Sequence, residues 1–144
     1  MDIRELRIGN IVKCKNYGRM FVDSIYAHSD KKVSCCTLRQ SEGFIVPIEY
    51  IYPIKINEEL LLKVGFSIEY NDITKDKYYR LRLNGFCIDI NKWSNTVGRD
   101  YGMHIDNLSC DSVLSADIQY LHQLQNCVFD ATGKELDVRN LLKY

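Results

Sequence analysis

The sequence has only two prolines and one tryptophan among 144 residues, and no apolar run near the roughly 20 residues of a membrane-spanning helix. Its 19 basic residues balance 19 acidic ones, so the formal net charge is zero. A chain without net charge has no overall field that attracts nucleic acid or an anionic membrane. The first residues, MDIRELRIGN, lack the apolar core of a signal peptide. These absences predict a cytoplasmic protein that does not span a membrane.

Several motifs of known chemistry are also missing. The sequence contains no Gly-x-Gly-x-x-Gly or Walker-type phosphate loop, no Cys-x-x-Cys pair and no His-x-x-x-His pair. Six cysteines are present, but in the cytoplasm they indicate reduced, mostly buried thiols. We therefore expect no metal and no cofactor. A metal set of Cys14, His28 and Cys36 and a catalytic trio around Cys110 are alternatives without a local signature.

The first 52 residues show the pattern of a small β-structure. Short alternating segments at 11–15, 20–26, 33–38 and 44–48 are separated by turns that contain Gly, Asn, Asp or Ser. Four strands at spacings near ten residues are typical of a meandering barrel. The sequence therefore predicts a small SH3-like antiparallel β-barrel over 1–52.

Residues 53–144 predict a second, α+β part, which could also be continuous with the first. Asn57 can cap a short helix over 57–64, and Gly65 can end it. Segments of β-structure follow, and a long C-terminal helix is expected over 116–131, with Ser115 as its N-cap and Gly133 beyond its end. The predicted fold class is therefore α+β.

The sharpest local signal is Asn84-Gly85, which predicts a two-residue hairpin loop. Such a loop fixes the register of the strands on either side. One face then pairs apolar side chains, namely Leu83 with Phe86, Leu81 with Ile88, and Tyr79 with Ile90. The other face pairs Arg82 with Cys87, Arg80 with Asp89, and Tyr78 with Asn91.

The predicted C-terminal helix carries an unusual face of neutral polar side chains. Gln119, His122, Gln123 and Asn126 follow i, i+3, i+4, i+7 spacing, whereas solvated helix faces usually carry Lys and Glu. Gln125 falls within the apolar sector instead. These side chains either form a network inside the fold or contact a partner chain. We refer to Gln119, His122, Gln123 and Asn126 as candidate binding residues.

Two further sets of residues are candidates for binding. Trp93 and Tyr101 lie in a polar stretch and could be exposed anchors for a partner. Tyr78, Arg80 and Arg82 form a basic, aromatic strand that suits single-stranded nucleic acid, although Asp89 opposes Arg80. Further positive charge near the N-terminus comes from Arg4, Arg7, Lys13, Lys15 and Arg19.

Three segments together resemble a known group of sequences. They are ELRIGN at 5–10, PIKINEELLLK at 53–63 followed by Gly65-Phe66, and HQLQN at 122–126 followed by TGKEL at 132–136. In this order they resemble a family of small uncharacterised proteins of Bacteroides-type bacteria, their phages and mobile elements. The resemblance implies a bacterial or phage setting and supplies no catalytic residues.

The leading functional expectation is a non-enzymatic accessory or binding module that acts through protein–protein contact, with a partner protein or with a second copy of itself. The alternative is a nucleic-acid-binding accessory protein, and the third possibility is an enzyme without a recognisable motif.

Overall fold

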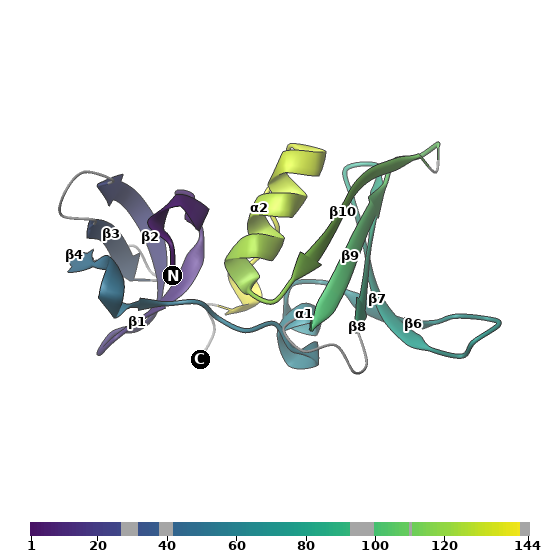
Figure 1. Ribbon diagram of the computed structural model, residues 1–144, viewed down its shortest axis with the longest axis horizontal. Helices are drawn as coiled ribbons and strands as arrows, with labels where there is room; N and C mark the ends of the chain where they lie inside the picture. Colours follow the sequence, from purple (N-terminus) through teal and green to yellow (C-terminus); the bar gives the residue numbers. More distant parts are fainter. Residues whose placement is uncertain (27–31, 38–41, 93–99, 110, 142–144) are drawn as a thin grey trace. The chain divides into compact units, whose positions relative to one another are not determined.

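The computed structural model describes residues 1–26, 32–37, 42–92, 100–109 and 111–141 (Figure 1). The chain divides into two compact units: unit 1 comprises Met1–Lys55 and Tyr120–Asn126, and unit 2 comprises Ile56–Gln119 and Cys127–Tyr144. Among these described residues, each unit contains one antiparallel sheet and two α-helices are present, so the α+β class is confirmed. In the described part of the chain, no helix is both long and apolar enough to cross a membrane.

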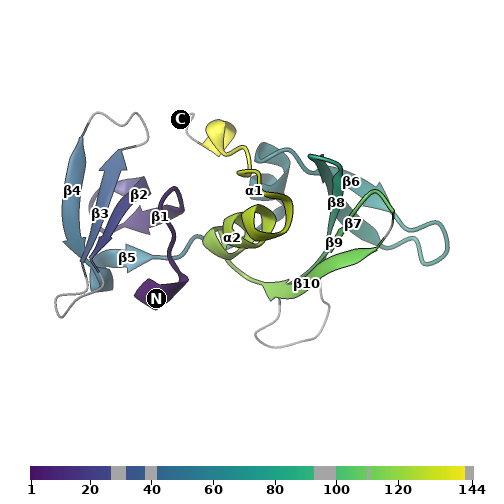
Figure 2. The same ribbon diagram turned by 90° about the horizontal axis from the view of Figure 1, so that it is seen from above.

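The sheet of unit 1 is a half-barrel of five antiparallel strands in the order β4-β3-β2-β1-β5 (Figure 2). Four strands lie within two residues of their predicted positions, whereas the short β5 was not anticipated. The elements of this unit are η1 (Ile3–Glu5), β1 (Ile11–Cys14), β2 (Gly18–Tyr26), β3 (Lys32–Thr37), β4 (Gly43–Pro47), η2 (Ile48–Tyr50) and β5 (Ile51–Tyr52), where η is a 3-10 helix.

One face of this sheet forms the core of unit 1. Alternation along β1 places Val12 and Cys14 in the core and leaves Lys13 exposed, because successive side chains point to opposite faces. Burial raises the pKa of the Cys35 thiol to about 12. Cys36 follows Cys35 and so faces away from the core that holds Cys14. The alternative metal set is therefore not assembled by Cys14 and Cys36, and its third member, His28, lies outside the described residues.

The sheet of unit 2 also has five antiparallel strands, in the order β10-β9-β8-β7-β6. The hairpin of β7 and β8 has the register that the two-residue loop predicts, in all six pairs. The elements of unit 2 are α1 (Glu58–Lys63), β6 (Ser67–Tyr70), β7 (Lys77–Leu83), β8 (Phe86–Lys92), β9 (Tyr101–Asp106), β10 (Ser112–Ile118) and η3 (Arg139–Leu141). The helix α2 (Leu121–Thr132) has its first residues in unit 1 and the rest in unit 2.

The short helix α1 forms where the sequence predicts it. Asn57 Oδ1 accepts a hydrogen bond from the Leu60 backbone N–H at 2.8 Å, which satisfies one of the free donors at the helix N-terminus. Gly65, with φ of 104°, takes the left-handed backbone that ends the helix. A helix this short depends on packing, and its Leu60 and Leu61 are buried.

The predicted start of the long helix was wrong. Residues 112–118 form β10, and α2 begins only at Leu121. Ser115 is therefore not an N-cap, and its hydroxyl contacts Nδ1 of His104 at 2.8 Å. Leu114, Ala116 and Ile118 alternate with exposed polar residues, a period of two that marks a half-buried strand. The end of the helix is close to the prediction, with Gly133 in the left-handed region at φ of 71°.

The turn between β7 and β8 gives a test of the hairpin. Gly85 has φ of 80°, and a Cβ there would lie 3.4 Å from Leu108 Cδ1. We expect Gly85→Ala to lower the free energy of unfolding by about 1–2 kcal/mol, since L-residues are strained in this region. Gly43→Ala is the control, because Gly43 has ordinary strand backbone and its added Cβ would be 3.9 Å from the nearest atom. Urea unfolding measures both, and equal losses would contradict the assigned turn.

Candidate functional site

The neutral face of α2 is bound to the N-terminal segment of its own chain, inside unit 1. Gln125 is 1% exposed. Its Oε1 accepts the N–H of Ile11 at 2.9 Å, and its Nε2 donates to the carbonyl of Gly9 at 3.1 Å. The side chain thus pairs two backbone groups at the start of β1 that would otherwise be buried without partners. This explains why an amide lies in the apolar sector of the helix.

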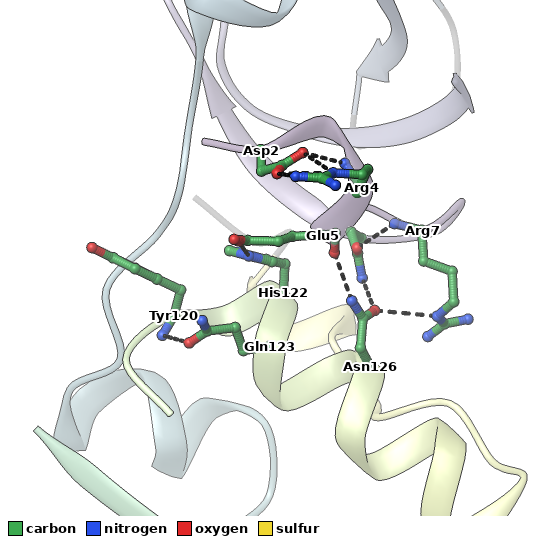
Figure 3. Close-up of polar contacts among 9 residues, drawn as sticks. Asp2, Arg4, Glu5, Arg7, Tyr120, His122, Gln123 and Asn126 are labelled. Carbon is green, nitrogen blue, oxygen red and sulfur yellow. Dashed lines mark hydrogen bonds and ion pairs between the residues drawn. The ribbon is translucent and has the colours of Figure 1, made fainter. Parts of the chain in front are cut away.

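Asn126 makes the second half of this contact (Figure 3). Its Nδ2 donates to the carbonyl of Glu5 at 2.8 Å, and its Oδ1 accepts from Asn10 Nδ2 at 2.8 Å and from Arg7 Nε at 3.2 Å. Asn10, fully buried, also accepts the backbone N–H of Arg7 at 2.7 Å. Asn126 therefore uses both its donor and its acceptor within the protein.

His122 lies one helical turn before Asn126 and contacts Glu5 (Figure 3). Its Nε2 is 3.3 Å from Glu5 Oε2, its ring stacks on Tyr120 at 5.8 Å between centroids, and only 1% of the residue is exposed. Burial lowers the pKa of His122, and the hydrogen bond and charge of Glu5 oppose this effect without cancelling it. Nδ1 is buried and has no hydrogen-bond partner among the described residues. The imidazole is therefore neutral at pH 7, with its proton on Nε2.

The other candidate binding residues have surroundings of their own. Gln123 Oε1 accepts the Tyr120 N–H at 3.1 Å and so caps the start of α2. Gln119 precedes the helix and belongs to unit 2, where its carbonyl accepts the N–H of Ile56 at 2.9 Å. Tyr101 is a β9 residue, 5% exposed, so it is not a surface anchor. Trp93 lies outside the described residues.

The predicted nucleic-acid strand is neutralised by its neighbour. Arg80 makes two hydrogen bonds to Asp89, at 2.7 Å and 2.9 Å, and lies 5.3 Å from the Tyr78 ring centroid. The Asp89 carboxylate raises the pKa of Arg80, so its charge is held and compensated within the sheet. Arg82 on the same face is exposed. The strand therefore offers one available cation rather than a basic surface.

A better basic surface lies on the exposed face of the unit 1 sheet. Lys13 is registered against Tyr52 on one side and Arg19 on the other, and Lys15 Nζ is 5.3 Å from the Tyr50 ring centroid. Tyr50 and Tyr52 are 42% and 45% exposed. We call Lys13, Lys15, Arg19, Tyr50 and Tyr52 the basic–aromatic face. Sequence reasoning noted the three cations but missed the two tyrosines, because β5 was not anticipated.

Charge is divided unequally between the units. The segments of unit 1 contain nine Lys and Arg against six Asp and Glu, a net charge of +3, and those of unit 2 contain ten against thirteen, a net charge of −3. Neither Lys13 nor Lys15 forms an ion pair with a carboxylate in the described parts of the chain. The net charge of the whole chain is therefore zero because a basic unit 1 and an acidic unit 2 cancel.

Comparison of the chain with protein-family models, curated proteins and solved structures gave no match. Within the described residues, no three His, Cys, Asp or Glu side chains are grouped so that they could hold a metal ion.

Replacement of Gln125 tests whether the amide in the apolar sector of α2 supports the fold. We expect Gln125→Leu to lower the free energy of unfolding by about 2–6 kcal/mol, because it leaves the N–H of Ile11 and the carbonyl of Gly9 unpaired, at about 1–3 kcal/mol each. Asp130→Asn, at an exposed position of the same helix, should change it by less than about 0.5 kcal/mol. Urea unfolding of the isolated chain is the measurement. A loss for Gln125→Leu as small as that of the control would show that the amide does not support the fold.

The neutral state of His122 predicts a pH dependence of stability. An unfolded chain binds a proton at His122 near pH 6.5, whereas the lowered pKa means that the folded chain binds it less strongly. The contribution of His122 to the free energy of unfolding is therefore fully present above about pH 6.5. It decreases as the pH is lowered from there, and the decrease ends at the folded-state pKa. Urea unfolding between about pH 7.5 and 5 should show this loss, and His122→Gln should reduce it.

The role of Glu5 is tested separately by NMR titration of the imidazole. Glu5→Gln should lower the His122 pKa further, because the carboxylate opposes the effect of burial. An unchanged His122 pKa in this variant would contradict the contact with Glu5.

Proposed function

We propose that unit 1 is a non-catalytic binding module whose basic–aromatic face binds single-stranded nucleic acid. The observation that carries the proposal is the cross-strand row Tyr52–Lys13–Arg19, with Lys15 and Tyr50 beside it. Proteins that bind single strands without sequence preference combine cations that follow the backbone with aromatic rings on which bases stack. This face has both, on a rigid sheet.

The electrostatics of the unit support the same function. A net charge of +3 on unit 1 gives an attractive field that the zero charge of the whole chain hides. Lys13 and Lys15 are exposed and not paired with described carboxylates, so neutralising phosphates costs no ion pair. By contrast, Arg80 would have to leave Asp89 before it could contact a phosphate.

The topology of the half-barrel supports assigning unit 1 to the SH3-like barrels. Its chain meanders from β1 to β4, passes through the single turn η2 and returns as β5 to pair with β1. We propose this assignment together with a cytoplasmic location and the bacterial or phage setting that the resemblance of 5–10, 53–66 and 122–136 implies.

A protein partner is the competing occupant of unit 1. The neutral face of α2, on which protein contact was first based, uses Gln125 and Asn126 for internal hydrogen bonds. Protein contact by unit 1 would therefore fall on the basic–aromatic face. The test below distinguishes the two occupants.

The test is fluorescence anisotropy of a labelled oligothymidylate of about 16 nucleotides at low salt. We expect binding that weakens as salt is added. The magnitude of the slope of log K against log salt should fall by about 1.4 in the Lys13→Gln, Lys15→Gln double variant. Tyr52→Ala should lose about 1–3 kcal/mol of binding free energy. Arg82→Gln and Lys75→Gln, exposed cations of unit 2, are matched controls and should bind as the parent does.

Absence of binding at low salt overturns the proposal, and so does an equal effect of the unit 2 controls. Self-association that is detected by light scattering and lost in Tyr52→Ala, without binding of the oligonucleotide, would assign the face to protein contact instead.

A further inference from the structure

A second group of interacting polar side chains lies on the exposed face of the unit 2 sheet. The strand register aligns Ser67, Arg80, Asp89, His104 and Ser115 in one row across all five strands. The Asp89 carboxylate is bound by Arg80, and the contacts of His104 are with Ser115 and Asp106 instead. The Ser115 hydroxyl is 2.8 Å from His104 Nδ1, and Asp106 Oδ1 is 2.7 Å from His104 Nε2.

The protons of this trio can be assigned from its chemistry. Asp106 lies within ion-pair distance of Nε2, and the negative charge of an ionised carboxylate there favours the tautomer in which Nε2 of His104 carries the proton. Nδ1 is then the basic nitrogen and accepts the hydrogen bond of the Ser115 hydroxyl. A serine that donates to an imidazole with a carboxylate on its other side resembles the arrangement that activates serine nucleophiles. Here the two ring nitrogens are exchanged, and Asp106 acts on His104 through its charge rather than through a directed hydrogen bond.

The trio borders a hollow in which a small molecule can lie. Its volume is about 430 Å³, and it is lined by Asn91, Gly102, Met103, His104, Ser115, Ala116 and Asp117. Gly102 stands between Asn91 and Asp117 in the neighbouring row, where it contributes no side chain. The Asn91 amide can donate a hydrogen bond, whereas the Asp117 carboxylate repels anions. The hollow therefore suits a small neutral or cationic ligand.

We propose that Ser115 is a nucleophile for acyl transfer and that unit 2 hydrolyses small neutral or cationic carboxylic esters. Ser115 Oγ attacks the ester carbonyl carbon while its proton passes to His104 Nδ1. The tetrahedral intermediate expels the alcohol, which takes that proton, and an acyl-Ser115 remains. Water then adds to the acyl carbon, gives a proton to His104 and releases the acid, and the returning proton restores the serine hydroxyl. The negative charge of Asp106, at ion-pair distance from Nε2, favours the charged form of His104 in both steps.

The first test is covalent labelling of the full chain with a fluorophosphonate, which transfers its phosphonyl group to an activated serine and loses fluoride. Peptide mass spectrometry should place the label on Ser115. Ser112 is the matched control, because it is exposed on the same strand and opposite Asp106. Labelling of Ser112 to the same extent, or of neither serine, overturns the proposal.

The second test is hydrolysis of p-nitrophenyl acetate, followed with variants whose fold is checked by urea unfolding. Ser115→Ala should abolish turnover, Ser112→Ala should leave it unchanged, and His104→Gln should reduce it by about 100-fold or more, the usual contribution of a general base. His104 itself can react with this ester. Turnover that survives in Ser115→Ala would therefore assign the reaction to the imidazole and overturn the role of Ser115. Because these residues belong to unit 2, the outcome is independent of oligonucleotide binding by unit 1.

Discussion

Unit 1 depends on one buried side-chain amide. Gln125 connects the first half of α2 to the start of β1 through a donor and an acceptor that belong to the backbone. The connection is needed because β1 begins directly after a turn, where the Gly9 carbonyl and the Ile11 N–H have no partner in the sheet ladder. Asn126 and Asn10 extend the same connection to Glu5 and Arg7. His122, Gln125 and Asn126 of the HQLQN string thus hold together segments more than a hundred positions apart in the sequence.

Elements defined by local chemistry could be predicted from the sequence. Asn84-Gly85 requires left-handed backbone in a two-residue loop, and the loop alone sets the register of β7 and β8. Asn57 and Gly65 likewise bound α1 with interactions inside the helix and its caps. In each case the information lies within a few residues.

Elements defined by distant partners could not be predicted. Residues 112–118 carry an N-cap-like Ser115 next to a helical pattern, which hides their short alternation of period two until pairing with β9 shows that they are a strand. The partners of His122 and Asn126 lie in the first ten residues, so the spacing of the helix face revealed its polarity but not its contacts. The two tyrosines of the basic–aromatic face join the lysines only through η2 and the two-residue β5. The trio of Ser115, His104 and Asp106 likewise requires the register of β9 and β10.

The buried thiols of unit 1 have a consequence for how its dynamics can be observed. Cys14 and Cys35 are almost fully enclosed in the half-barrel, and burial raises the pKa of both, so neither forms a reactive thiolate while the unit is closed. Alkylation at these two positions requires the strands to separate first. The rate at which these two thiols are alkylated therefore reports the opening of the half-barrel, as slow amide exchange reports the opening of a helix. Cys36, half-buried on the outer face of β3, gives the comparison within the same unit: burial raises its pKa too, but alkylation there does not require the strands to separate.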